Sequence, residues 1–310
     1  MPLRIVFLLA LAFLAACSST EINEGADKPL SLSTEPAPSL SNGPKKLLVV
    51  QPVNLSAHGA QILEKSTLAF IESWIQLNGV FTYVPVDDLE TEEKFLSQDK
   101  VYDVQKLMDA AADQGISALV IPEIEEIEVR SEGDTEGFFR NRTQITSARV
   151  RIRVYDVKTR KQILSRRRTA KYSEGQTTFL GGKTEAEYVE SQGEEAVKLA
   201  MGEVLELLPQ YAKRIDWTGQ IARIDHARIY LDSGRITGLQ VGQVLKVYAP
   251  LHRVPNEATK QELGVARGPL RGTIKIIEFI GEDGALALAH SGTGFEAKDH
   301  VEMFLPRHQN

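Results

Sequence analysis

The sequence predicts an α+β fold, in which a sheet covered by helices is followed by a small all-β domain resembling a barrel. Over residues 45–171, apolar strand-like runs alternate with amphipathic helical segments. From residue 216 onward, glycines recur between short β-rich runs, which is typical of a small barrel or sandwich. We place the boundary near residue 214, which gives domains at 45–214 and 215–310.

The first domain begins with alternating strands and helices. Five elements are expected in this order: a buried strand at 47–50, an amphipathic helix at 60–78, a short strand at 80–86, a helix at 103–114 and a strand at 116–129. Asn78-Gly79 and Gly115 are the expected helix ends. Pro122 indicates a bulge or an edge position within its strand.

Two rows of opposite charge lie on consecutive strands. Residues 148–155, ARVRIRVY, place three arginines on one face and apolar side chains on the other. The preceding strand carries glutamates at 123, 125, 126 and 128. We expect the strands to pair antiparallel across a loop at 131–143, with glutamates opposite arginines that help to fix the register. The alternative is that both rows are simply solvated faces.

The first domain is expected to close with a strand and a helix. A turn at 156–160 leads into a strand at 161–171 and a loop at 173–183. Helical spacing follows over 184–214, and Pro209 is expected to interrupt or kink that helix. Its predicted apolar stripe consists of Ala196, Leu199, Ala200, Val204, Leu207 and Leu208.

The second domain is expected to contain six strands. Its β-rich runs are GQIARI, ARIYLDSG, QVLKVYAP, GTIKIIEFI, GALALAH and HVEMFLP.

The first seventeen residues have the features of an export signal. Arg4 precedes an apolar run at 5–14, which is shorter than the about 20 residues of a membrane-spanning helix. The run ends Leu-Ala-Ala-Cys17, which resembles the lipobox of bacterial lipoproteins. That resemblance implies cleavage after residue 16 and a lipid, such as palmitate, on Cys17. The alternative is a stray cysteine in a discarded leader.

Residues 17–44 are expected to form a lipidated, flexible tether. They are rich in Ser, Pro, Gly and acidic residues, and have few large apolar groups with which to offset the entropy of ordering. Ser18 follows the cysteine where an Asp would be the inner-membrane retention signal in the enteric pattern. We therefore expect attachment to the outer membrane, facing the periplasm.

Composition limits the classes of partner. The 310 residues are 42% hydrophobic and 25% charged, with a net charge of −6. The chain has no basic domain of the kind that binds nucleic acid, so no nucleic-acid partner is expected. Cys17 is the only cysteine, so we expect no disulfide, no cysteine-ligated zinc and no cysteine nucleophile.

No catalytic motif emerges from the sequence. The six histidines form no HExxH pattern, and neither G-x-S-x-G nor a complete phosphate loop occurs. Residues 181–184, Gly-Gly-Lys-Thr, imitate only the tail of a phosphate loop. The acidic pairs Asp87-Asp88 and Glu92-Glu93 fit a helix start or a solvated loop. We therefore expect no metal, no cofactor and no enzymatic activity.

Two short stretches are candidates for contact with a protein partner. Arg166, Arg167 and Arg168 form a basic run that could bind an acidic partner or phosphate; the alternative is a solvated strand. Phe138 and Phe139 lie in the predicted loop 131–143 and are expected to be exposed. The alternative is that this loop folds back onto the core.

Residues 45–171 resemble the periplasmic α/β domain of the CsgG family, which TolB and the lipoprotein LpoB share in outline. The matching stretches are KKLLVVQPVNLS, VFTYVPVDDL, AAADQGISALVIPEIEEI and ARVRIRVYDVKTRKQILSRRRTAKY. Arg160 stands where the family usually has a glycine, so the turn is expected to differ. Residues 216–304 resemble the carboxy-terminal domain of FlgT, through DWTGQIARID, IYLDSGRITGLQVGQVLKVYAP and GTIKIIEF.

These resemblances imply an outer-membrane lipoprotein with a structural or assembly role. The machine would be a flagellar basal-body ring or a secretion complex, with envelope proteins as partners and homo-oligomers possible. The first alternative is a regulatory lipoprotein that activates a peptidoglycan synthase. A CsgG-like secretion-pore subunit is less favoured, because the predicted loops 131–143 and 173–183 are too short and polar for two membrane hairpins.

Overall fold

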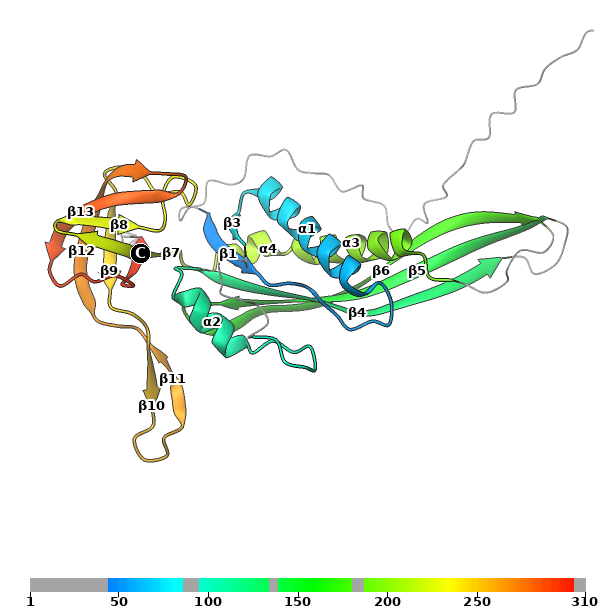
Figure 1. The fold of residues 1–310 in the computed structure, drawn as a ribbon, viewed down its shortest axis with the longest axis horizontal. Coiled ribbons are helices and arrows are strands. Elements are labelled where there is room, and N and C mark those ends of the chain that lie inside the picture. The colour runs from blue at the N-terminus through cyan, green and yellow to red at the C-terminus, as the bar shows by residue number, and fades with distance from the viewer. Residues whose placement is uncertain (1–43, 86–94, 134–138, 180–186, 304–310) are drawn as a thin grey trace, which may run out of the picture. The chain divides into compact units, whose positions relative to one another are not determined.

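A six-stranded sheet forms the first part of the structure. The computed structural model describes residues 44–85, 95–133, 139–179 and 187–303 (Figure 1). The strand order is β3-β1-β4-β5-β6, with the short β2 beside β4. Strands β1, β2 and β3 run parallel to their neighbours, whereas β4, β5 and β6 pair antiparallel. The bounds are β1 Lys45–Val49, β2 Val53–Asn54, β3 Phe81–Val84, β4 Ala118–Gly133, β5 Phe139–Asp156 and β6 Lys161–Phe179.

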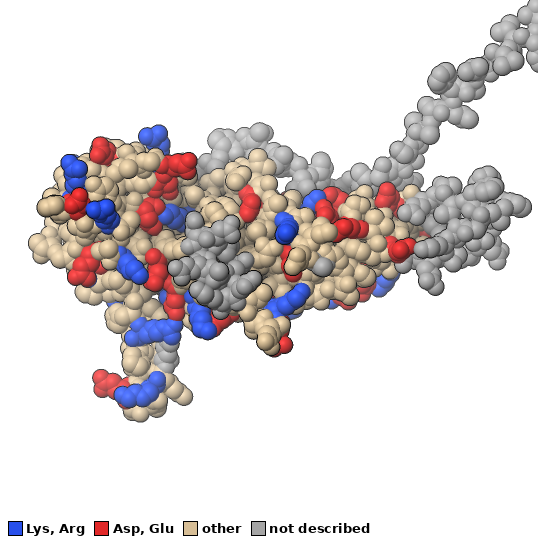
Figure 2. Space-filling model, viewed as in Figure 1, with Lys and Arg blue, Asp and Glu red and all other residues tan. Residues whose placement is uncertain are grey.

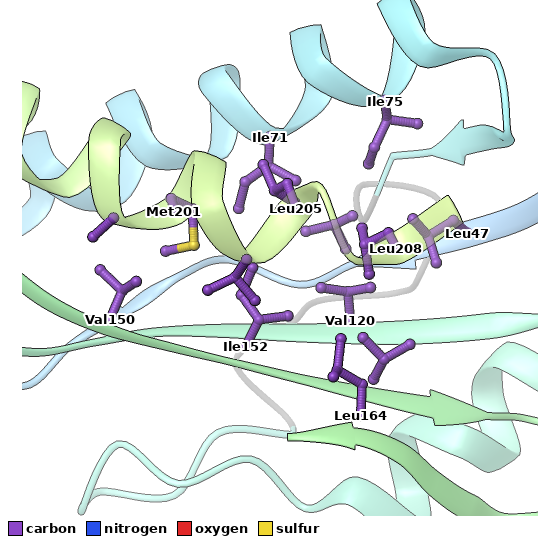
Figure 3. Packing of buried hydrophobic residues seen from close by; sticks show 14 of the residues in the cluster. Leu47, Ile71, Ile75, Val120, Val150, Ile152, Leu164, Met201, Leu205 and Leu208 are labelled. Carbon is purple, nitrogen blue, oxygen red and sulfur yellow. The ribbon is translucent and has the colours of Figure 1, made fainter. Parts of the chain in front are cut away.

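Helices cover both faces of this sheet (Figure 1). On one face lie α1 (Ala60–Asn78), α3 (Glu190–Leu205) and α4 (Leu208–Ala212), whose apolar side chains pack on β4, β5 and β6 to form the larger core (Figure 3). On the other face, α2 (Val104–Ala112) forms a smaller core with β1, β4 and the end of β5. The sheet is thus the middle of three layers.

The predicted helix at 60–78 is confirmed, as is its end. The buried positions of α1 recur every four residues, at Leu63, Thr67, Ile71 and Ile75. Gly79 takes a positive φ of 60° and its N–H donates to the Ile75 carbonyl, which ends the helix in the left-handed conformation that glycine favours.

The predicted helix at 184–214 is only partly correct. It begins at Glu190 and breaks before α4, whose first turn contains Pro209. The proline was expected to interrupt the helix, since its ring prevents continuation of the backbone ladder. The assignment of Leu199 to the buried stripe is wrong, because this residue is 40% exposed. The positions that face the sheet recur every four residues from Ala196, and Leu199 lies off that row.

Both predicted loops of the first domain overlap with strands. Strands β4 and β5 reach Gly133 and Phe139, and β6 continues to Phe179, with Phe139 opposite Phe179 in the register. The sequence in these stretches is polar, so it lacks the apolar alternation that predicts a strand. Pairing of backbone groups extends the hairpin without that signal. The length of these stretches therefore no longer counts against a pore subunit, whereas their polar sequence still does.

Strand β4 lies inside the sheet, and Pro122 is at neither a bulge nor an edge, contrary to the prediction. The pairing of β1 with β4 ends at Val120 and that of β2 begins at Glu123, so Pro122 lies where no neighbour needs its missing N–H. The bulge comes later, at Glu125, which has no register partner on β5. Because of this bulge, the next core-facing residue after Ile124 is Ile127, three residues later, whereas a regular strand would place it two residues later.

The expected pairing of glutamates with arginines is confirmed. Glu123 lies opposite Arg151, and Glu126 lies opposite Arg149. Arg149 and Glu126 form an ion pair of 2.7 Å, while the Glu123 carboxylate binds both Arg151 and Arg153. Glu123 is 6% exposed, so its charge needs these partners. The charged rows therefore hold the register and are more than solvated faces.

Replacement of the buried glutamate should test this role. We expect Glu123→Gln to lower the free energy of unfolding by about 2–3 kcal/mol, because the partly buried Arg153 loses its counter-charge and Arg151 keeps only Glu125. Chemical denaturation of the full chain measures the change. The matched control is Glu126→Gln in the exposed pair, which should cost less than about 1 kcal/mol. Equal losses in the two variants would contradict a special role for Glu123.

The second part of the structure is a closed six-stranded barrel, in the order β12-β13-β8-β7-β14-β9. Its strands correspond to the six predicted β-rich runs, so the predicted α+β fold with a small barrel-like domain is confirmed. The bounds are β7 Thr218–Asp225, β8 Arg228–Leu231, β9 Val244–Tyr248, β12 Leu270–Ile280, β13 Gly284–Gly292 and β14 His300–Met303.

The sequence did not indicate one element, a two-stranded ribbon between β9 and β12. It consists of β10 (His252–Pro255) and β11 (Glu262–Ala266), which pair only with each other among the described strands. Its sequence, HRVPNEATKQELGVA, lacks a sustained apolar alternation.

Candidate interaction surface

Strand β6 lies at an edge of the sheet, and its middle is exposed. Within the described ranges it pairs only with β5, so one side of a 19-residue strand is left without a neighbouring strand. Five consecutive side chains at 165–169 are exposed, including Arg166, Arg167 and Arg168. The basic run predicted from sequence therefore lies on an accessible strand edge.

The three arginines point to both faces of the sheet. Arg166 and Arg168 lie opposite Ile152 and Val150, whose side chains belong to the larger core, so they share the face that carries α3. Arg167 lies opposite Arg151, on the other face. Positive charge therefore lies along this edge on both faces of the sheet.

Two of these arginines are held by acids from neighbouring elements. Arg167 Nε lies 2.8 Å from Glu125 Oε1, and Arg168 Nε lies 3.5 Å from Glu203 on α3. No ion pair involves Arg166 or Lys171 within the part of the chain that the structure describes. Over residues 161–171 the chain carries five cations and no acid. We call this stretch the cationic edge.

Charges on one face of the molecule are mixed in sign. On the face shown in Figure 2, basic and acidic side chains are interspersed over the barrel, and few charges lie over α1. A run of five like charges on one strand edge differs from this pattern. The cationic edge is therefore the feature of the described surface best suited to an acidic partner.

The aromatic candidates remain predictions. Phe138 lies outside the described residues, and so does Cys17. Phe139 is the first residue of β5, in register with Phe179 at the end of β6. The structure thus places its backbone near the tip of the long hairpin, about ten residue pairs from the cationic edge.

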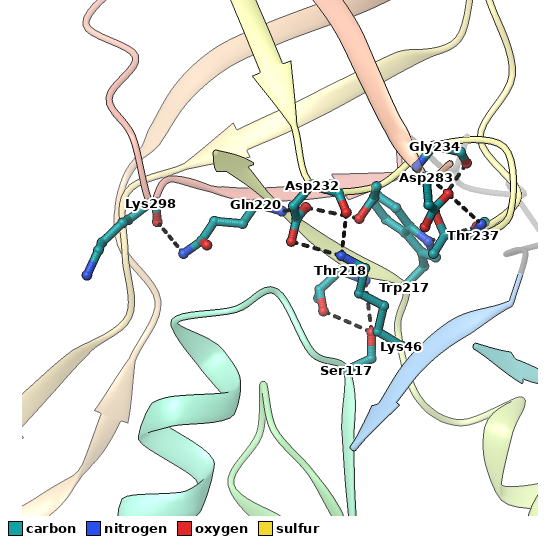
Figure 4. Close-up of polar contacts among 11 residues, drawn as sticks. Lys46, Ser117, Trp217, Thr218, Gln220, Asp232, Gly234, Thr237, Asp283 and Lys298 are labelled. Carbon is teal, nitrogen blue, oxygen red and sulfur yellow. Dashed lines mark hydrogen bonds and ion pairs between the residues drawn. The ribbon is translucent and has the colours of Figure 1, made fainter. Parts of the chain in front are cut away.

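Asp232 joins the sheet to the barrel (Figure 4). Its carboxylate accepts from the Gln220 backbone N–H at 2.8 Å and from Lys46 Nζ on β1 at 3.0 Å. Gly115 has a positive φ of 64°, and a Cβ there would lie 2.5 Å from Asp232 Oδ2. Glycine is therefore needed at this position both for its conformation and for the close approach. The sequence predicted Gly115 as a helix end but did not indicate its closeness to Asp232.

Two buried hydroxyls join the same parts beside Asp232. The Ser117 hydroxyl, directly before β4, lies 3.0 Å from the Thr218 hydroxyl at the start of β7 (Figure 4). Both residues are less than a tenth exposed. Buried polar groups need such partners, so this contact fixes where the barrel begins relative to the sheet.

Arg160 occupies the turn between β5 and β6 in a left-handed conformation, with φ of 57°. This left-handed conformation is one that glycine favours and that an arginine adopts rarely. The Arg160 guanidinium is largely buried, and its Nη1 lies 2.7 Å from Asp109 Oδ1 on α2. Arg253 of β10 pairs with the same Asp109.

These ion pairs line a small cleft of about 150 Å³ beside α2, the turn and the base of the ribbon. His300, at the start of β14, forms part of its wall. Burial lowers the pKa of His300 and the positive charge of Arg160 acts in the same direction, while Glu302, Asp113 and Asp232 oppose the shift. Acidic and basic side chains are balanced in the cleft, so it gives no net charge with which to select a ligand.

Within the described ranges, no three histidine, cysteine or acidic side chains gather as a metal would require. In the same ranges, no helix has both the length and the apolar composition needed to span a bilayer.

No protein-family model matches the chain, and no curated protein matches it. Among solved structures, it is similar to lipoprotein GNA1162 from Neisseria meningitidis, at 13% identity and a TM-score of 0.30, over 54% of this chain and 99% of that chain. It is also similar to the PelC dodecamer from Paraburkholderia phytofirmans, at 13% identity and a TM-score of 0.30, over 56% and 91%. It is similar as well to the LpoB C-terminal domain from Salmonella enterica, at 18% identity and a TM-score of 0.29, over 41% of this chain and 83% of that chain. At TM-scores below 0.5, these likenesses support no inference about role.

Acidification should destabilise the fold through His300. Because its pKa in the folded state lies below the ordinary value of 6.5, the unfolded chain takes up the proton first as pH falls. The contribution of the neutral His300 side chain to the free energy of unfolding is therefore complete above pH 6.5 and is lost as pH falls below that value. We expect His300→Gln to flatten the dependence of unfolding free energy on pH between pH 7.5 and 5.5, as measured by urea denaturation.

The matched control for that prediction is His290→Gln, which removes an exposed histidine. The control should keep the pH dependence of the parent chain. A pH dependence in His300→Gln equal to that of the parent would show that His300 is not responsible.

Proposed function

We propose that this protein is a lipoprotein of the outer membrane, facing the periplasm, with a structural or assembly role in an envelope machine. The cationic edge is the observation that carries the proposal. A long strand edge with accessible backbone groups is a template for another strand, and a strand partner adds both hydrogen bonds and side-chain specificity. The part of the chain that binds would therefore be the sheet, and the binding partner a protein.

The membrane attachment in this proposal rests on the leader. Leu14-Ala15-Ala16-Cys17 has the lipobox pattern, and a thiol that carries several acyl chains holds a protein firmly to a bilayer. Residues 17–44 would then give the folded part a reach of about 30 Å from the membrane.

The choice of a flagellar basal-body ring or a secretion complex rests on the resemblance of residues 216–304 to the FlgT carboxy-terminal domain. The tie between sheet and barrel through Asp232 suits a structural component, because a load on one part is transmitted to the other. The alternative, activation of a peptidoglycan synthase, rests on the resemblance of residues 45–171 to LpoB. The resemblance to CsgG leaves a pore subunit as a further, less favoured alternative.

Loss of the anchor cysteine is the first test. We expect Cys17→Ala to shift the protein from the outer-membrane fraction to the soluble periplasmic fraction, as followed by fractionation and immunoblotting. Ser18→Ala, which leaves the cysteine in place, is the matched control and should stay in the membrane. A Cys17→Ala protein that still sediments with outer membrane would refute the lipid anchor.

The second test identifies the partner. A photo-reactive residue is placed at Thr169 on the cationic edge, or at Ser73 on the exposed side of α1 as the control, and products formed in cells are identified by mass spectrometry. Products specific to position 169 that contain basal-body or secretion components would support the assembly role. A peptidoglycan synthase in their place would favour the regulatory alternative and overturn the assembly role.

A further inference from the structure

We propose that the cationic edge of one molecule receives the acidic segment 86–94 of a second copy of this chain. This inference rests on the proposed function in one respect, that the edge of β6 binds protein. It goes further by naming the partner and the part of the partner that binds.

Like charges exclude the symmetric arrangement. Two copies that met through their β6 edges would bring five cations against five cations, of which only Arg167 and Arg168 have acidic partners among the described residues. Like charges directly opposite each other destabilise a strand pair. The arginines thus protect the edge from pairing with itself. They leave it open to a segment of opposite charge.

The chain contains such a segment. Residues 86–94 read VDDLETEEK, with five acids and one lysine. The stretch 17–44 has four acids and one lysine among 28 residues, so its negative charge is far more dilute. Charge complementarity therefore favours residues 86–94 as the occupant.

The acidic segment leaves the sheet at the edge opposite β6. It follows β3, which is the other edge strand, four strand positions away from β6. The segment ends at Phe95, whose carbonyl accepts from the Asp103 N–H beside Tyr102, and the Tyr102 hydroxyl donates to the Gln51 carbonyl just after β1. Both ends are therefore held on the side of β1 and β3.

This position prevents the segment from reaching the β6 edge of its own molecule. Ten residues between Val84 and Phe95 span about 37 Å at most when fully extended. The crossing from β3 to β6 and the return to the level of β1 take about 33 Å. The few ångströms that remain are too short for a strand pair. The occupant is therefore the segment of another copy.

The resulting contact is heterologous, since it joins two different edges. Such contacts repeat from copy to copy and generate a ring if the rotation closes, or a filament if it does not. The β6 edge of each copy in a chain of contacts would be covered by the next copy, which removes the exposed strand.

Cysteine cross-linking in cells tests the proposal with the full chain. Cys17 is the only cysteine and is expected to be blocked by lipid, so two introduced thiols report cleanly. We expect the variant with Thr169→Cys and Leu89→Cys to form disulfide-linked dimers and higher multimers. Each single variant should form far fewer of these species. The absence of multimers from the double variant would overturn the proposal.

Charge reversal provides a second, independent measurement. In that double-cysteine variant, we expect Arg166→Glu with Arg168→Glu to lower the yield of multimers about tenfold, because acids then face acids. Further changes of Glu92→Lys and Glu93→Lys in the same chain should restore the yield. The matched control reverses two exposed cations elsewhere, Lys65→Glu and Lys213→Glu, and should leave the yield unchanged. Loss without restoration would contradict the pairing of these two segments.

These experiments distinguish a failure of the proposed function from a failure of the contact between copies. Photo-cross-linking at Thr169 to an envelope protein, with no multimers from the cysteine pair, would refute the second copy as partner and leave the proposed function intact. Multimers from the cysteine pair without any envelope protein would support the contact between copies and count against the role in a larger machine.

Discussion

The fold of the first domain depends on the register of β4 against β5. Side chains alternate between the two faces, so a slip of one residue would turn arginines 149, 151 and 153 toward the core and their apolar neighbours toward solvent. The buried Glu123 carboxylate holds two of these arginines on the correct face. The bulge at Glu125 then keeps Ile127 on the core side. The position of β6, and hence of its cationic edge, follows from this pairing.

The register also determines where the barrel attaches. Ser117 directly precedes β4, and its hydroxyl contacts Thr218 at the start of the first barrel strand. Lys46 on the neighbouring β1 reaches Asp232 of the barrel. Because both contacts start from the same ends of paired strands, the barrel is tied to the sheet where β1 and β4 begin. The long hairpin of β5 and β6 extends away from this junction, so its edge stays accessible (Figure 1).

Sequence periodicity predicted the elements that bury an apolar face, namely α1, the core-facing half of β5 and the six barrel strands. It could not predict the outer halves of β5 and β6 or the last four residues of β4, because backbone pairing alone extends these strands through polar residues. The basic run was found from sequence, but its place on an edge strand was not, since strand order depends on contacts distant in the chain. Gly115 was recognised as a helix end, while its closeness to Asp232 required the three-dimensional structure.

The ribbon of β10 and β11 takes no part in closing the barrel, because β9 pairs directly with β12 and Tyr248 lies opposite Leu270. The chain thus leaves the barrel and re-enters it at adjacent positions. A segment inserted in this way can change in length or sequence, or be replaced by a short turn, while the closed sheet keeps all of its pairings. The barrel can accordingly keep the same strand pairing whatever the ribbon between β9 and β12 contains.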